Sequence, residues 1–173
     1  MAKTPSDITK TQSSLEKINR LTPQQFDIRI AADGTWFHEG GLIGRQGLVR
    51  LFASVLQRYE DGTFWLVTPV ERGQITVEDA PFIGIALAVT GQGIDRELKL
   101  TTNVGDIVRI DNDHKLRMQT AEDGDARPYV TIRDRLDAKL SRPVYYELAA
   151  LAESDDDGRL GVWSAGSFFP LMD

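Results

Sequence analysis

Cysteine is absent from the 173-residue sequence, and histidine occurs only twice. The first absence excludes disulfide bonds, thiolate metal sites, iron–sulfur clusters and a cysteine nucleophile. The second leaves little room for a histidine-rich metal centre. No segment approaches the ~18 consecutive apolar residues that a membrane-spanning helix needs. The start of the chain also lacks the apolar run of a secretory signal, so we expect a cytoplasmic protein.

Charge of one sign is in modest excess: 26 acidic residues stand against 20 basic ones, which gives a net charge of −6. This balance argues against sequence-independent binding to a nucleic acid polymer or to an anionic membrane. Hydrophobic residues make up 41% of the sequence, which is typical of a globular protein. A chain of this length can bury about 70% of its unfolded surface, so it can form a core without disulfides.

Alternating apolar residues predict that most of the chain is β-structure. The clearest signal is Asp33-Gly34, a turn dipeptide between two alternating segments, which predicts a hairpin. Residues 73–120 keep a period of two and predict an antiparallel meander. Within it, residues 82–89 are nearly all apolar, as in a strand that is buried on both faces. Further hairpin turns are predicted at residues 111–113 and 155–158.

Helical patterns are fewer. The clearest covers residues 45–59, where apolar residues recur at three- and four-residue spacing. Capping-box spacings predict two shorter helices, one starting at Ser13 and one within residues 131–140. Ser141-Arg142-Pro143 is expected to end the latter, because a residue before proline is pushed out of the helical region. Residues 144–151 then read as the first strand of the last hairpin.

The chain contains one internal echo and no linker between domains. A predicted helix followed by a strand occurs twice at a constant offset, with an arginine and two apolar residues in each copy: Arg45, Leu48 and Phe52, then Arg133, Leu136 and Leu140. A duplicated helix-plus-strand unit and a chance match both fit this pattern. Residues 1–12 are polar, and we expect a disordered lead-in there.

The segment from His38 to Arg45 is the most suggestive for binding. A glycine-rich turn that leads into a helix leaves backbone N–H groups at the positive end of the helix dipole, and Arg45 adds a guanidinium. Such an end can hold a phosphate or a carboxylate. Alternatively, the glycines serve turn geometry and Arg45 pairs with Glu39 or Glu71. His38 either contacts a ligand, acts as a general base, or bonds a nearby carbonyl.

Templates for catalysis mostly fail. The glycines at positions 40–47 are not followed by the lysine of a phosphate-binding loop. The carboxylates of Glu71, Glu78 and Asp79 could pair for acid–base chemistry, but acids at strand edges commonly pair with basic neighbours. A hydrolase that uses His38 with a carboxylate on phosphoesters therefore stays an alternative, and a non-enzymatic protein is favoured.

Three stretches carry a resemblance to a known family: Asp33–Phe52, Leu66–Phe82 and Gly161–Pro170. They resemble the bacterial proteins catalogued as the domain of unknown function 1285 family. The resemblance implies an α+β fold with an antiparallel β-rich core and a repeated helix-plus-strand motif. It also implies two subdomains that divide near Gly91, at residues 13–90 and 91–173, the second superficially like a pleckstrin-homology domain.

The resemblance further implies a small nucleotide-like or otherwise anionic ligand in a cleft between the subdomains, and a role in signalling. The matched positions that could contact such a ligand are Trp36, His38, Arg45, Thr68, Glu71, Asp79, Trp163 and Ser167. In this hypothesis Trp36 or Trp163 stacks on a base and Arg45 holds a phosphate. The sequence identifies no resident cofactor or metal, and it leaves the ligand and the oligomeric state open.

A protein-interaction adaptor is the other alternative. In that hypothesis Trp36, Phe37 and Trp163 form an exposed apolar patch that binds a partner protein. The three functional classes differ in what they need from the structure: a charged hollow for the binding module, a base beside a carboxylate for the hydrolase, and an exposed apolar surface for the adaptor.

Overall fold

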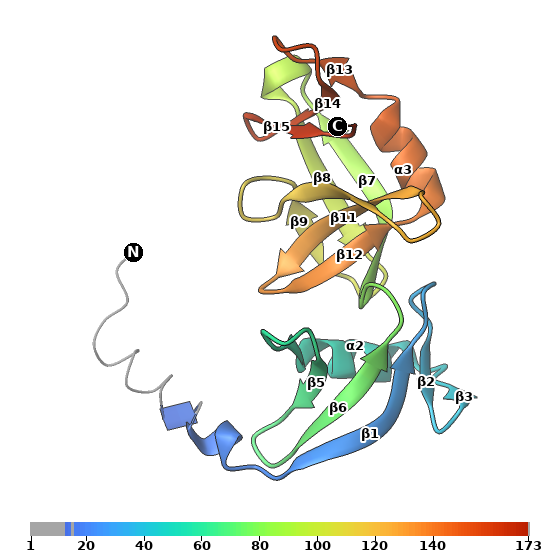
Figure 1. Cartoon of the computed structure of the whole chain (residues 1–173), viewed down its shortest axis with the longest axis vertical. Helices are drawn as coiled ribbons and strands as arrows, with labels where there is room; N and C mark the ends of the chain where they lie inside the picture. Colours follow the sequence, from blue (N-terminus) through green and yellow to red (C-terminus); the bar gives the residue numbers. More distant parts are fainter. Residues whose placement is uncertain (1–12, 15, 173) are drawn as a thin grey trace. The chain divides into compact units, whose positions relative to one another are not determined.

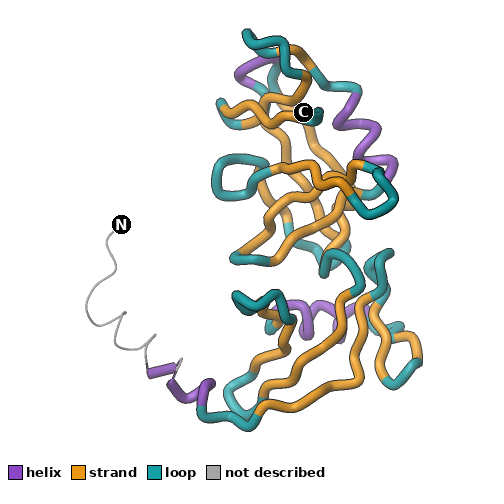
Figure 2. Tube along the Cα trace, viewed as in Figure 1, coloured by secondary structure: helices purple, strands orange, loops and turns teal. Residues whose placement is uncertain are grey.

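The computed structural model describes residues 13, 14 and 16–172, and the predicted lead-in at residues 1–12 lies outside them. The chain forms two compact units. Of the described residues, unit 1 holds those up to Arg29 together with Trp36–Val77, and unit 2 holds Ile30–Thr35 together with those from Glu78 onward. Strands dominate both units (Figures 1 and 2). The expected α+β class with a β-rich core is therefore confirmed.

Unit 1 is built on one six-stranded sheet. Its strands are β1 (Pro23–Ile30), β2 (Trp36–His38), β3 (Gly41–Leu42), β4 (Leu56–Arg58), β5 (Phe64–Val67) and β6 (Arg72–Val77), in the order β3-β2-β1-β6-β5-β4. Alternation sets the faces of this sheet: Ile28 and Ile75 are buried, whereas Asp27 and Thr76 are exposed.

The predicted turn at Asp33-Gly34 joins β1 to β2. The Ala31 N–H donates to the Thr35 carbonyl at 2.8 Å. The Asp33 carboxylate accepts the Thr35 N–H at 3.0 Å, and Gly34 has a φ of +87°, which favours glycine. The hairpin prediction is confirmed, and its tip belongs to unit 2.

Helix α2 (Gln46–Ser54) buries Val49 and Ala53. The Phe52 ring stacks on the Trp36 ring with centroids 6.2 Å apart. The helix is shorter than the predicted 45–59, because Leu56 begins strand β4 and pairs with β5. Tertiary strand pairing overrides the helical period there.

The three- and four-residue apolar spacing, which includes Leu48 and Leu51, predicts the buried face of this helix only in part. Leu48 and Leu51 are 37% and 59% exposed. The buried face of the helix runs through Val49 and Ala53 instead, which lie four residues apart and therefore on the same face.

Unit 2 holds a second six-stranded sheet and a three-stranded one. The six strands are β7 (Phe82–Thr90), β8 (Glu97–Thr102), β9 (Ile107–Arg109), β10 (Leu116–Thr120), β11 (Ala126–Arg133) and β12 (Leu136–Leu140), in the order β10-β11-β12-β7-β8-β9, with the 3₁₀ turn η1 (Gly93–Asp95) between β7 and β8. The three are β13 (Glu153–Ser154), β14 (Leu160–Ser164) and β15 (Ser167–Pro170). Strands β12 and β7 pair in parallel. The antiparallel meander predicted over residues 73–120 is only partly right, because β7, β8 and β9 pair in succession while β6 belongs to the unit 1 sheet and β10 lies at the other edge.

The hairpin predicted around residues 111–113 is wrong. Strands β9 and β10, which flank this turn, lie at opposite ends of the strand order. The Asp111 carboxylate accepts the N–H groups of Asp113 and His114, both at 2.9 Å. Its local bonds therefore form a turn, but the chain crosses to the other edge of the sheet instead of folding back.

Strand β7 is buried over only the first third of its length. Phe82 and Ile83 are buried, whereas Ile85 is 53% and Val89 43% exposed. Strand β12 pairs with β7 only from Phe82 to Gly84. The prediction of burial on both faces therefore fails beyond Gly84.

The helix predicted within residues 131–140 is a hairpin of β11 and β12, and Asp134 takes a positive φ of 45° at its turn. The proposed repeat of α2 at Arg133–Leu140 is therefore wrong. The helix instead lies where a strand was predicted, as α3 (Arg142–Ala149). Pro143 stands in its first turn, where the missing N–H would have no intrahelical partner.

Helix α3 packs against β7 and β14, with Val144 and Leu148 buried (Figure 1). Gly91, near which the family resemblance implies a division into subdomains, stands in the turn between β7 and β8, and these two strands pair in one sheet. The compact units divide at Val77 and Glu78 instead. No helix of the described residues is long and apolar enough to cross a membrane.

Candidate functional site

A hollow of about 890 Å³ lies beside the first turn of α3, entirely within unit 2. Its walls come from the β1–β2 hairpin tip, the start of β7, the β10–β11 turn, the end of β12 and the start of α3. The lining residues are Ala32, Asp33, Ile83, Asp125, Ala126, Arg127, Pro128, Lys139, Leu140, Ser141, Arg142, Tyr145 and Tyr146.

Charged side chains of both signs line this hollow. Three are basic, Arg127, Lys139 and Arg142, and two are acidic, Asp33 and Asp125. Arg142 is exposed, and no hydrogen bond or ion pair joins its guanidinium to another described residue. Its five N–H donors are therefore available to an anionic group in the hollow.

Lys139 is held in place by its neighbours. Its Nζ atom donates to Asp79 Oδ2 at 2.8 Å, and the Tyr129 hydroxyl donates to Asp79 Oδ1 at 2.7 Å. The side chains of Lys139 and Asp79 are only 21% and 18% exposed. Burial alone would raise the pKa of Asp79, but the hydrogen bonds from Lys139 and Tyr129 outweigh it and lower that pKa.

The register of the sheet brings this group together. Tyr129 on β11 pairs with Lys139 on β12 and with Arg117 on β10. Arg117 in turn donates to Asp137 at 2.6 Å. Burial and the hydrogen bond to Asp79 raise the pKa of Tyr129 to about 12, so its hydroxyl stays protonated and donates.

The start of α3 forms the opposite wall. The Ser141 N–H donates to the Gly84 carbonyl at 2.9 Å, and no side chain caps the helix. The first turn contains no acidic residue, so the positive end of the helix dipole is not neutralised locally. The rings of Tyr145 and Tyr146, with centroids 6.3 Å apart, add aromatic surface.

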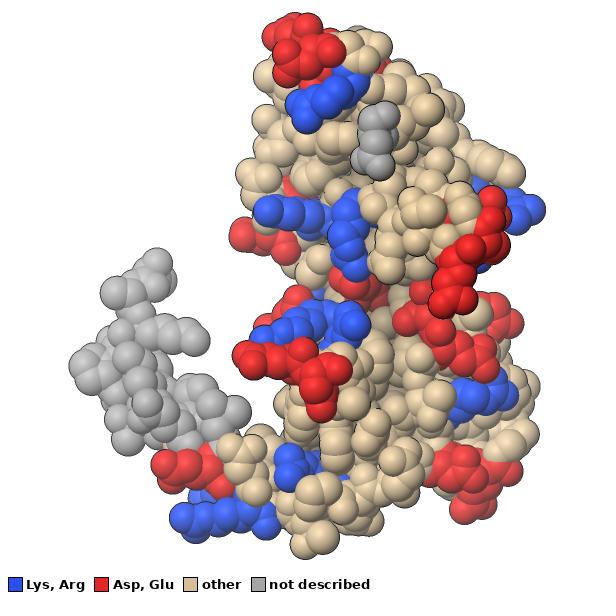
Figure 3. Space-filling model, viewed as in Figure 1, with Lys and Arg blue, Asp and Glu red and all other residues tan. Residues whose placement is uncertain are grey.

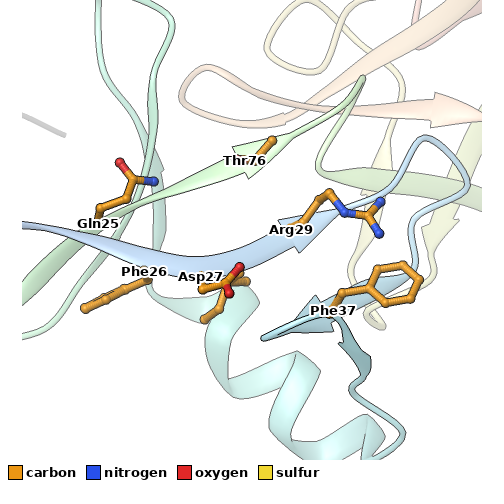
Figure 4. A pocket seen from close by; sticks show the side chains of 8 residues that line it. Gln25, Phe26, Asp27, Arg29, Phe37 and Thr76 are labelled. Atoms are coloured by element: carbon orange, nitrogen blue, oxygen red, sulfur yellow. The ribbon is translucent and has the colours of Figure 1, made fainter.

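A smaller hollow of about 330 Å³ lies on the exposed face of the unit 1 sheet (Figure 4). Gln25, Asp27 and Thr76 line it from β1 and β6. The Arg29 guanidinium lies 4.3 Å from the Phe37 ring centroid, a cation–π contact that covers one face of the ring. This hollow offers less space and no aromatic surface as open as Tyr146, which is 62% exposed.

The predicted anion site at the start of α2 lies outside both hollows. Arg45 is exposed at the N-cap of α2, and its carbonyl accepts the N–H groups of Leu48 and Val49. His38 is exposed at the end of β2, with Nε2 3.8 Å from Glu39 Oε1. Neither Arg45 nor His38 lines either of the two hollows.

Thr68 and Glu71 belong to one turn between β5 and β6. The Thr68 hydroxyl accepts the Glu71 N–H at 3.2 Å and donates to the Glu71 carbonyl at 3.1 Å. Through these hydrogen bonds the Thr68 hydroxyl stabilises the turn. The Glu71 side chain is exposed, and no ion pair joins it to His38 or Arg45 within the described residues.

Trp36 is only 2% exposed and lies in the core of unit 1, which removes it as a stacking surface and as part of an exposed patch. Trp163 is half-buried on β14, and its ring centroid lies 5.2 Å from that of Phe168 in an edge-on contact. Ser167 is half-buried on β15 and pairs with Ser164. Neither Trp163 nor Ser167 lines the α3 hollow.

Of the predicted residues, only Asp79 touches a wall of the α3 hollow, through Lys139. Sequence reasoning missed Arg142, Lys139 and Tyr145. One local signal could have found the helix: Ser141 followed by a proline two residues later is a common helix start. Within the described residues, no group of three or more His, Asp or Glu side chains could hold a metal ion.

The fold and its charged hollow define an α+β protein of two β-rich units. Two family models match it: the N-terminal domain of unknown function DUF1285 over residues 16–80, and the C-terminal domain of the protein of unknown function DUF1285 over residues 81–171. The chain therefore belongs to the DUF1285 family, as its three motif stretches predict.

Solved structures agree with this assignment. The crystal structure of a DUF1285 family protein from Silicibacter pomeroyi DSS-3 is 44% identical, with a TM-score of 0.83 over 90% of this chain and 86% of that one. A DUF1285 family protein from Shewanella baltica OS155 is 28% identical, with a TM-score of 0.55 over 70% of this chain and 89% of that one. No curated protein matches the chain.

Proposed function

We propose that this protein is a non-enzymatic binding module that holds a small anionic molecule in the hollow beside α3. The observation that carries the proposal is the exposed Arg142 guanidinium, which lines a hollow of about 890 Å³ and has no partner among the described residues. A charge-assisted hydrogen bond from arginine to a phosphate or carboxylate is among the stronger polar contacts in proteins.

A nucleotide-like molecule suits the composition of this hollow. Its volume falls within the ~300–1,000 Å³ range of small-molecule sites. Arg142 and the first turn of α3 would receive the anionic group, and Tyr145 or Tyr146 would contact a ring. Lys139 lies on the same wall, where Asp79 and Tyr129 fix its position.

The family resemblance adds three elements to this proposal. It implies a ligand between two subdomains, a second subdomain like a pleckstrin-homology domain, and a role in signalling. All three stay predictions. The site proposed here needs residues of unit 2 alone, so its test does not depend on them.

Isothermal titration of the full chain with adenosine 5′-monophosphate tests the proposal. Arg142→Ala should weaken binding about 10- to 100-fold, in line with the ~1.5–3 kcal/mol of a hydrogen bond to a charged group. Arg45→Ala is the matched control, because it removes the exposed guanidinium from the other helix start and should leave the affinity unchanged. A loss of affinity in Arg45→Ala alone would move the site to α2.

A protein-interaction adaptor is the second candidate, supported by apolar side chains exposed on unit 1. Leu42, Leu51 and Val70 are 66%, 59% and 80% exposed. Contiguous exposed apolar side chains can mark a contact surface, and a charge at Leu51 tests whether α2 takes part in one. Leu51→Asp should abolish co-purification of a partner if α2 carries this surface, whereas Arg142→Ala should not affect it.

A further inference from the structure

We propose that the α3 hollow selects a group with a single negative charge, a phosphodiester or a carboxylate, over the dianion of a phosphomonoester. This inference rests on the proposed function and concerns the charge of the ligand rather than its presence. It follows from how the charges around the hollow are already paired.

Two of the three cations that line the hollow have carboxylate partners. Lys139 Nζ lies 2.8 Å from Asp79 Oδ2, and an Arg127 guanidinium nitrogen lies 2.7 Å from Asp123 Oδ2. Each pair is close to neutral, so neither cation offers a full positive charge to a ligand. Arg142 is the third, and it lacks such a partner among the described residues.

Two carboxylates line the hollow directly. Asp33 Oδ1 accepts the Thr35 N–H at 3.0 Å, and the bonds from Thr35 lower the pKa of Asp33, so this carboxylate is charged at neutral pH. Asp125 lines the hollow from the β10–β11 turn. Asp79 and Asp123 do not line the hollow, but as the ion-pair partners of Lys139 and Arg127 they bring the acidic groups to four against three basic ones.

This arrangement favours one negative charge on the ligand and disfavours a second. The first charge pairs with Arg142. A second charge finds no uncompensated cation and lies in the field of Asp33 and Asp125, where like charges repel. The same two carboxylates accept hydrogen bonds, so they suit hydroxyl or amino groups elsewhere on the ligand.

Two ligands that differ mainly in the charge of their phosphate group test this preference. Adenosine 5′-monophosphate carries a dianionic phosphomonoester at pH 8, since its second pKa is about 6. Its 5′-monomethyl ester has the same base and sugar but a single negative charge. Titration calorimetry of the full chain at pH 8 should show the ester binding at least about tenfold more tightly.

A variant tests the cause of the preference. Asp125→Asn removes one of the two repelling charges and should reduce the preference for the ester several-fold by tightening binding of the monophosphate. Asp156→Asn makes the same charge change in the exposed β13–β14 turn and should leave the preference unchanged. Circular dichroism of both variants verifies that they fold.

The outcomes separate this inference from the proposed function. Equal or tighter binding of the monophosphate, with a loss of affinity in Arg142→Ala, overturns the charge selection and leaves the anion site standing. An ester preference that survives Asp125→Asn unchanged also overturns it. If neither probe binds at millimolar concentration, the proposed function and this inference both fail.

Discussion

The ammonium of Lys139 lies 2.8 Å from the carboxylate of Asp79, which stands 60 residues earlier in the chain. The lysine comes from strand β12, and the aspartate is the second residue of the segment of unit 2 that begins at Glu78. Together with the Tyr129 hydroxyl, this contact anchors the start of unit 2 to its central strands. It also fixes one wall of the hollow beside α3.

Replacing Asp79 by asparagine should destabilise the protein by about 1–2 kcal/mol, because it leaves the partly buried Lys139 ammonium without its anion. The lowered pKa of Asp79 means that its contribution is present above pH 3.8 and is lost as the pH falls through the folded value. Urea unfolding should therefore show a wild-type advantage at pH 7 that shrinks below pH 3.8. A constant difference at both pH values would contradict the ion pair.

Tyr129 predicts a loss of stability in alkali. Burial and the bond to Asp79 raise its pKa to about 12 from 10.0. Because the unfolded chain loses this proton first, stability is complete below pH 10 and falls as the pH rises toward 12. Ultraviolet titration should reveal one late tyrosinate that Tyr129→Phe removes. The account is wrong if the variant retains the late-titrating group.

Ser164 bridges two backbone groups in the core of unit 2. Its hydroxyl accepts the Leu98 N–H at 3.0 Å and donates to the Ile110 carbonyl at 2.6 Å, and the residue is fully buried. Ser164→Ala should lower the free energy of unfolding by about 1–3 kcal/mol, since it leaves two buried backbone groups unsatisfied. Ser167→Ala, at the paired position on β15, is the control and should cost under ~0.5 kcal/mol.

Gly34 and Gly124 offer a matched test of close packing. Both have a positive φ, +87° and +85°. A Cβ at Gly34 would lie 2.6 Å from an Ile83 carbon and 2.9 Å from the Asn103 side chain, whereas one at Gly124 meets nothing within 4 Å. Both alanine variants should be less stable by ~1–2 kcal/mol, because alanine is strained in the left-handed backbone region. Gly34→Ala should lose more stability than Gly124→Ala, because its Cβ also clashes with neighbouring side chains. Thermal unfolding that ranks them equally would contradict the packing of this hairpin tip.

The sequence predicts the strands of this protein better than its helices. Strand β6 follows from alternation, because Gly73 and Ile75 are buried and their neighbours along the strand are not. The sequence does not predict helix α3, because Pro143 is compatible both with the end of one helix and with the first turn of the next. The capping-box spacing in residues 131–140 favours the first of these, whereas the structure has the second. Only the pairing of β11 with β12 decides between them.

The candidate site was harder to predict than the fold. The family motifs contain Asp33 and Asp79, but Arg142 and Tyr145 lie in a segment read as a strand. The hollow unites segments around residues 33, 83, 126 and 142, which lie far apart along the chain. Spacing arguments work within one helix or hairpin, so they direct attention to the glycine-rich turn before Arg45 instead.

The net charge of the sequence also gives no indication of where a small anion could bind. Net charge argues against a strongly basic surface, and basic and acidic side chains do stand next to one another on the face shown in Figure 3. A site for a small anion needs only one uncompensated cation in a hollow, which composition does not reveal. Arg142 has that position in unit 2.

The most direct test of an anion site beside α3 is amide chemical-shift mapping of the full chain during titration with the 5′-monomethyl ester of adenosine 5′-monophosphate. The shifts should concentrate on Asp125–Arg127 and Lys139–Tyr146 and saturate together. Shifts confined to the residues around His38 and Arg45, or no saturable shifts at millimolar ester, would contradict the account.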